Sequence, residues 1–118
     1  MSDFRKLGVY NKSLQFVNDI YKLSDKFPNE ERFSLTSQFK RAAASICLNI
    51  AEGSGRYHKK DFAHFLRSSL GSSLECSALL DIALKLSYIS EDEHNNFVEK
   101  CAEIGKMLNG LISSLLRD

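Results

Sequence analysis

The chain has 118 residues, enough for one domain with a hydrophobic core of its own. Its single proline and its hydrophobic content of 43% argue against a disordered chain and favour an all-helical fold. The net charge of +1 conceals an uneven distribution, because residues 40–67 carry a net charge of +4 and residues 68–118 a net charge of −4.

The first predicted helix covers about residues 10–26, where apolar side chains recur at helical rather than alternating spacing. Its buried side is expected to carry Leu14, Val17, Ile20 and Tyr21. The sequence Phe27-Pro28-Asn29 ends this helix, because a residue that precedes proline disfavours the helical conformation.

The second predicted helix, residues 36–53, carries no charge between Ala42 and Ala51. Nearly every side of it is apolar or small, whereas a surface helix has one apolar and one polar face. A small domain does not easily surround one of its own helices, so we expect a second copy of the chain to cover the outer side. Gly53 and Gly55 are expected to end the helix, with glycine in the left-handed cap conformation.

The third predicted helix, residues 59–87, has a length of roughly 43 Å at about 1.5 Å per residue. Gly71 lies in its middle, where glycine costs about 1 kcal/mol relative to alanine, and therefore indicates a close approach of another helix. The fourth helix follows Ser90, which is predicted to form a capping box with Glu93. Because the connections are short, the fold class predicted is all-α, a single-domain antiparallel up-down-up-down four-helix bundle. The uncharged second helix adds the expectation that this bundle forms a homo-oligomer.

No N-terminal apolar run and no stretch of about 18 apolar residues is present, so we expect neither a signal peptide nor a membrane span, and a cytoplasmic protein without a membrane partner. The three cysteines, Cys47, Cys76 and Cys101, form no CxxC pair and fall within helical patterns. They are interpreted as reduced core thiols, not as metal ligands or catalytic groups.

A polar stripe follows the second helix and has a counterpart on the third. Its members are Arg41, Ser45, Asn49, Glu52 and Arg56 on the second helix, with Ser68, Ser72 and Glu75 on the third. We interpret Arg41, Ser45, Asn49, Glu52, Ser72 and Glu75 as a structural polar network that fixes helix register or a subunit interface. A catalytic carboxylate pair, Glu52 with Glu75, is the alternative, although no nucleophile or phosphate-binding glycine loop accompanies it.

Two carboxylate-x-x-His pairs, Asp61 with His64 and Glu91 with His94, have the spacing of di-iron bundles. Each pair begins one of two successive antiparallel helices, so the two pairs are expected at opposite ends, roughly 35 Å apart. The sequence therefore predicts no metal site and no cofactor.

A basic cluster is the best functional candidate. It consists of Arg56, His58, Lys59, Lys60, His64 and Arg67, with Tyr57 interleaved. Its place at the turn between the second and third helices predicts an exposed basic end, which could contact nucleic-acid phosphates without reading bases. Several copies in a ring would sum to a stronger field, whereas a solvated surface patch is the alternative interpretation.

The sequence FPNEERFSLTSQFKRAAASICLNIAEGSGR, from Phe27 to Arg56, is followed by DFAHFLRSSLGSSLE, from Asp61 to Glu75. Together these segments resemble the four helix bundle protein family, which includes proteins encoded in intervening sequences of bacterial 23S ribosomal RNA genes. The resemblance covers nearly the whole chain and includes the FP-x-x-E, LTSQ, RAA-x-SI, NIAEG-x-GR and GS-x-x-E elements. The family is related to the accessory variability proteins of diversity-generating retroelements.

The resemblance implies an antiparallel four-helix bundle that assembles into a ring, typically a homopentamer. The retroelement relatives are strongly basic barrels that bind nucleic acid and a reverse transcriptase, whereas this chain is nearly neutral. The positions that match the family signature are Arg41, Ser45, Asn49, Glu52, Gly53, Arg56, Ser72 and Glu75.

The predicted function is a non-enzymatic homo-oligomeric bundle that binds RNA or DNA weakly through the basic cluster. An oligomeric scaffold that binds another protein, without a nucleic-acid role, is the alternative. An enzyme that uses Glu52 and Glu75 is a third hypothesis. Salt-dependent binding to generic RNA separates the first two hypotheses.

Overall fold

The structure is a computed structural model that describes residues 3–117. Its regular secondary structure over those residues is entirely helical, which confirms the predicted all-α class with four α-helices. The elements are the 3-10 helix η1 (Phe4–Lys6), α1 (Gly8–Ser24), the 3-10 helix η2 (Asn29–Glu31), α2 (Leu35–Ser54), α3 (Lys59–Lys85) and α4 (Glu91–Leu116).

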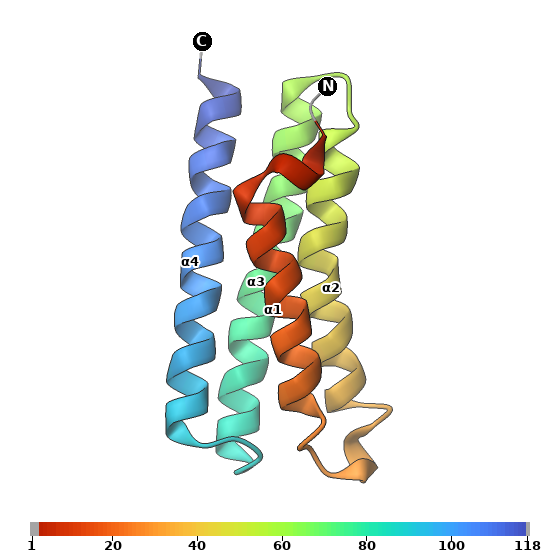
Figure 1. The fold of residues 1–118 in the computed structure, drawn as a ribbon, viewed down its shortest axis with the longest axis vertical. Coiled ribbons are helices and arrows are strands. Elements are labelled where there is room, and N and C mark those ends of the chain that lie inside the picture. Colours follow the sequence, from red (N-terminus) through yellow and green to blue (C-terminus); the bar gives the residue numbers. More distant parts are fainter. Residues whose placement is uncertain (1–2, 118) are drawn as a thin grey trace.

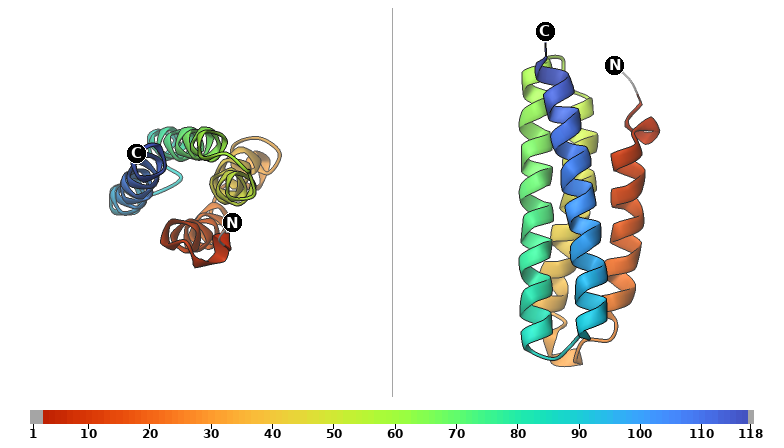
Figure 2. Two further views of the ribbon diagram at one scale, coloured as in Figure 1. Left: turned by 90° about the horizontal axis from the view of Figure 1, so that it is seen from above. Right: turned by 90° about the vertical axis from the view of Figure 1, so that its left-hand side faces the viewer.

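The four helices lie lengthwise beside one another in a body of 47 × 23 × 19 Å (Figure 1). Both termini and the α2–α3 turn lie at one end, and the α1–α2 and α3–α4 connections lie at the other. Seen from above, α2 and α3 pack closely, whereas α1 and α4 make the least extensive contact of any neighbouring pair (Figure 2).

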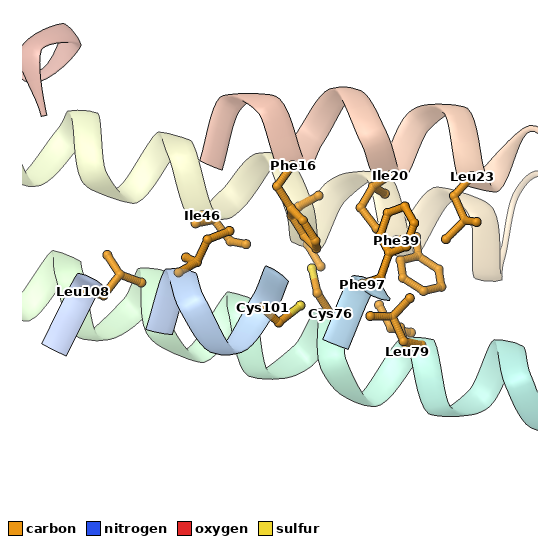
Figure 3. Packing of buried hydrophobic residues seen from close by; sticks show 14 of the residues in the cluster. Phe16, Ile20, Leu23, Phe39, Ile46, Cys76, Leu79, Phe97, Cys101 and Leu108 are labelled. Atoms are coloured by element: carbon orange, nitrogen blue, oxygen red, sulfur yellow. The ribbon is translucent and has the colours of Figure 1, made fainter. Parts of the chain in front are cut away.

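The core lies between the four helices and consists of one apolar cluster. Phe16, Phe39, Leu108 and the other labelled side chains of Figure 3 project inward from all four helices. Cys76 and Cys101 lie next to each other in this core. Burial raises the pKa of the Cys101 thiol to about 12 and that of the Cys76 thiol further still, so both are protonated at neutral pH.

The buried side of α1 differs from the prediction. Val9, Phe16, Ile20 and Leu23 face the core, whereas Leu14 and Tyr21 are exposed. The predicted stripe was therefore rotated by part of a turn. The prediction omits Phe16, which is buried and packs near Phe97, with the ring centroids 6.3 Å apart.

Two glycine predictions are wrong. Gly71 is exposed, and a Cβ added there would meet no atom within 4 Å, so in the subunit it permits no close helix approach. The close approach occurs at Gly53, where a Cβ would lie 2.7 Å from Phe65 Cβ and 3.2 Å from the Phe62 carbonyl oxygen. Gly53 and Gly55 both have negative φ, so Gly53 serves helix packing and not a left-handed cap.

The helix ends agree with the prediction at α4 and differ at α3. Ser90 and Glu93 form the predicted capping box, which is confirmed. The third helix ends at Lys85 because Ser87 adopts a left-handed φ of 64°. The Tyr88 amide then donates to the Ala83 carbonyl at 2.9 Å, and the chain turns sharply toward α4.

Candidate nucleic-acid interface

The basic cluster occupies the α2–α3 turn and the first three turns of α3, and all six of its members are exposed. Lys60, His64 and Arg67 are spaced four and three residues apart, so α3 presents them as one line along its surface. Among residues 3–117, no carboxylate lies within 4.0 Å of the charged nitrogens of Lys59, Lys60 or Arg67. These three cations can therefore meet an external anion without first breaking an ion pair.

Arg56 is engaged within the subunit. Its guanidinium lies over the Phe65 ring, with Cζ 4.5 Å from the ring centroid, and Nη2 lies 3.7 Å from Glu52 Oε2. Phe65 is the same residue that packs against Gly53. The arginine therefore helps to join the end of α2 to the beginning of α3, and its charge is partly compensated.

Two further cations lie at the same end of the molecule. Arg5 and Lys6 belong to η1, which contacts α2 near the α2–α3 turn (Figure 1). This segment is fixed by Asn11, whose Nδ2 donates to the Arg5 carbonyl at 2.9 Å. The sequence prediction missed these residues because only the fold brings the N-terminal segment beside a turn about fifty positions later.

The opposite end of the molecule is acidic. The first turn of α4 carries Glu91, Asp92 and Glu93, and η2 carries Glu30 and Glu31. Tyr88 Oη donates to Glu31 Oε2 at 2.8 Å and joins the two connections at this end. The uneven charge along the sequence thus becomes a partial separation of charge along the long axis, with a basic end and an acidic end. It is partial because Lys22, Lys26, Arg32 and Lys85 also lie at the acidic end.

The polar stripe divides into three parts. Ser45, Asn49 and Ser72 are half-buried and in contact: Asn49 Nδ2 donates to Ser45 Oγ at 3.0 Å, and Ser72 Oγ lies 2.9 Å from Ser45 Oγ. Glu52 instead pairs with Arg56. Arg41 and Glu75 are exposed and line a groove of about 590 Å³ between α2 and α3, together with Ser45 and Ser72.

The two carboxylates of the enzyme hypothesis lie far apart. The contact between Ser45 and Ser72 fixes the level at which α2 and α3 pass each other. Glu52 lies seven residues from that level toward the basic end and Glu75 three residues toward the acidic end. At about 1.5 Å per residue they are separated by roughly 15 Å along the axis. Paired carboxylates of glycosidases lie about 5–9.5 Å apart, so Glu52 and Glu75 are not arranged as such a pair.

The histidines of the two carboxylate-x-x-His pairs have different surroundings. His94 lies at the acidic end, where its Nε2 is 2.7 Å from Asp81 Oδ1, whereas His64 is exposed beside Phe65 at the basic end. Within residues 3–117, no group of three His, Cys, Asp or Glu side chains could hold a metal ion. None of the helices described here is both long and apolar enough to cross a membrane.

Residues 5–110 match the family described as 23S rRNA-intervening sequence protein. The chain belongs to this family. A crystallographically determined relative, a protein of unknown function from the S23 ribosomal protein family of Bacteroides thetaiotaomicron, is 28% identical and has a TM-score of 0.82. The match covers 89% of this chain and 95% of that one. No curated protein matches the chain.

Proposed function

We propose that the protein is a non-enzymatic homo-oligomeric bundle whose basic end binds RNA or DNA through the phosphate backbone. The observation that carries this proposal is the separation of charge along the long axis. Lys59, Lys60 and Arg67 lie unpaired at one end within the described residues. Lys6 and Arg5 lie at the same end, although Arg5 is paired with Asp3, with Nη1 3.4 Å from Oδ1. Exposed, unpaired cations suit sequence-independent phosphate contact, because they release counterions on binding and need no groove-reading element.

We further propose that the helices form an up-down-up-down bundle and that copies assemble into a ring, a pentamer by resemblance to the family. A ring needs two different, complementary patches on each subunit. Leu48 is 67% exposed on the outer side of α2, while Leu74 is 64% exposed beside an apolar groove between α3 and α4. A leucine of one copy entering that groove on the next would cover both patches.

A ring of this kind would gather the basic ends of all copies on one face. Cyclic symmetry repeats each surface at the same height, so a modest patch becomes a continuous basic rim. The three buried, protonated thiols suit a cytoplasmic site of action, where cysteines stay reduced.

A protein-interaction scaffold is the second candidate function. The groove between α2 and α3 favours this function, because Arg41 and Glu75 line the groove. A segment of a partner protein that carries both an acidic and a basic side chain would complement these two charges. Binding of a protein at this groove would be insensitive to changes at the basic end. The two candidate functions are therefore separable by substitution.

The test compares Lys59→Glu plus Lys60→Glu with a control, Lys22→Glu plus Lys85→Glu, which makes the same change in net charge at the acidic end. Fluorescence anisotropy with a labelled generic RNA is measured over a series of salt concentrations. We expect the first variant to lose most of its affinity and its log–log salt slope to become shallower by about 1.4, for two lost phosphate contacts to a single strand. Equal behaviour of both variants and the native protein would contradict the proposal.

A further inference from the structure

Tyr57 is the most exposed large hydrophobic side chain of the described residues, with 90% of its surface accessible, and it lies between Arg56 and His58 in the α2–α3 turn. It borders an open depression of about 520 Å³ formed with His58, Lys59, Lys60 and one carboxylate, Asp61. An aromatic ring at such a position is held out of the core by the turn. With this exposure, the Tyr57 ring contributes little to packing within the subunit.

The surroundings of Tyr57 differ from those of the other exposed aromatic rings. Tyr21 and Phe33 are 43% and 85% exposed, and each carries a cation on its face: Lys40 Nζ lies 4.7 Å from the Tyr21 centroid and Arg32 Cζ lies 4.7 Å from the Phe33 centroid. Tyr57 has more basic residues beside it in the sequence than either of these rings. Even so, no lysine or arginine of residues 3–117 covers its ring.

The reason lies in the neighbouring contacts. Arg56 points back to Phe65 and Glu52, away from Tyr57. The His58 ring meets the Tyr57 ring edge to face, with centroids 4.9 Å apart and an interplanar angle of 87°. This contact supports the tyrosine from one side and leaves ring surface open to solvent.

An open aromatic face beside exposed cations is complementary to an unpaired nucleotide. A base released from a duplex offers a flat face that can stack on the ring, and its flanking phosphates can reach Lys59 and Lys60. A duplex offers phosphates to the lysines but keeps its base faces covered by stacking within the helix. The lysines therefore serve both forms of nucleic acid, whereas the tyrosine serves only the single-stranded form.

We propose, on the basis of the nucleic-acid function above, that the α2–α3 turn is a single-strand-selective site in which Tyr57 stacks on an unpaired base. The shared ligand chemistry is a single-stranded polynucleotide, from either RNA or DNA. Selectivity for single strands resides in Tyr57, and the phosphate contacts reside in Lys59 and Lys60.

The experiment uses the full chain and three labelled probes of equal length: a single-stranded RNA without self-complementarity, the DNA of the same sequence, and the RNA duplex. Tyr57→Ala is compared with Tyr57→Phe, which keeps the stacking surface, and with Phe33→Ala, which removes an equally exposed ring whose face Arg32 already covers. Native mass is measured for each variant, so that affinities are compared between equal assemblies.

We expect Tyr57→Ala to weaken single-strand binding by roughly 5- to 150-fold, the range for loss of one base–aromatic stack, and to leave duplex binding within twofold. Tyr57→Phe and Phe33→Ala should retain single-strand affinity. The RNA and DNA arms identify which polynucleotide the site prefers.

The contrary outcomes are distinct. If the native protein binds none of the probes, the proposed nucleic-acid function fails and the stacking site fails with it. If the native protein binds and Lys59→Glu plus Lys60→Glu abolishes binding, but Tyr57→Ala changes nothing, the nucleic-acid function stands and the stacking role of Tyr57 is wrong. Equal weakening of single-strand and duplex binding by Tyr57→Ala would also overturn the selectivity.

Discussion

Lys100 Nζ lies 2.9 Å from Asp19 Oδ2 and joins α4 to α1 across the least extensive helix contact of the bundle. The ammonium also lies 5.1 Å from the centroid of the Phe97 ring, which packs near Phe16 on α1. Lys12 with Glu103 and Lys26 with Glu93 form two more pairs along the same boundary. Ion pairs thus supplement a boundary where apolar packing is least.

The Asp19–Lys100 pair should make part of the stability depend on acidic pH. Burial opposes ionisation of Asp19, but hydrogen bonds from Lys100 and Gln15 outweigh it and hold its pKa below the ordinary 3.8. Because the folded pKa is the lower one, this contribution is complete above about pH 4 and is lost as the pH falls through the folded pKa.

Asp19→Asn should therefore cost about 1 kcal/mol in the free energy of unfolding at pH 7 and less near pH 2. Denaturant unfolding at both pH values measures this, and Asp92→Asn, an exposed change at the acidic end, serves as the control. An unchanged pH profile in Asp19→Asn would show that the pair contributes nothing.

Alanine at Gly53 and alanine at Gly71 should have opposite effects on stability. At Gly53 the new Cβ would collide with Phe65 Cβ and with the Phe62 backbone, so α2 and α3 must separate and stability should fall by about 1–3 kcal/mol. At Gly71 the new methyl meets nothing, and the greater helix propensity of alanine should raise stability by about 0.5–1 kcal/mol. Thermal unfolding of the two variants measures both signs, and a stabilised Gly53→Ala would refute the packing role.

His94 should contribute to stability with the opposite pH dependence. The hydrogen bond with Asp81 is the main cause that raises the pKa of His94 above 6.5, and the hydrogen bond with Asn95 raises it further. Because the folded pKa is the higher one, the stabilisation is complete below about pH 6.5 and is lost as the pH rises through the folded pKa. NMR titration of the ring should give a raised pKa in the native protein that returns toward 6.5 in Asp81→Asn, and an identical titration in both would contradict the contact.

The proposed ring depends on two exposed leucines, Leu48 on α2 and Leu74 on α3, which lie on different faces of the subunit. Leu48→Lys and Leu74→Lys should each lower the native mass toward that of one subunit, because a lysine cannot be buried without a partner in an apolar contact. Leu14→Lys, on the exposed side of α1, should leave the mass unchanged. An unchanged native mass in both test variants would exclude this ring interface.

Sequence reasoning succeeded where a local rule governs the chain. Ser90 and Glu93 specify the start of α4 because both partners of the capping box lie within one helical turn. It failed at Ser87, where a serine takes the left-handed conformation that glycine usually supplies. The left-handed turn is offset by tertiary contacts, because it brings Tyr88 to Glu31 and Phe27 at the acidic end.

The candidate site shows the same division. By itself the sequence determined four helices, an exposed basic turn and three core thiols, because periodicity and charge are properties of neighbouring residues. Only the tertiary structure decided that Arg5 lies at the basic end and that Arg56 turns back to Phe65 while Tyr57 stays uncovered. It also decided that position 53 requires glycine because a Cβ would collide with α3, and not because the backbone is left-handed there. These features depend on contacts between helices, and the packing of helices fixes distances that no local pattern records.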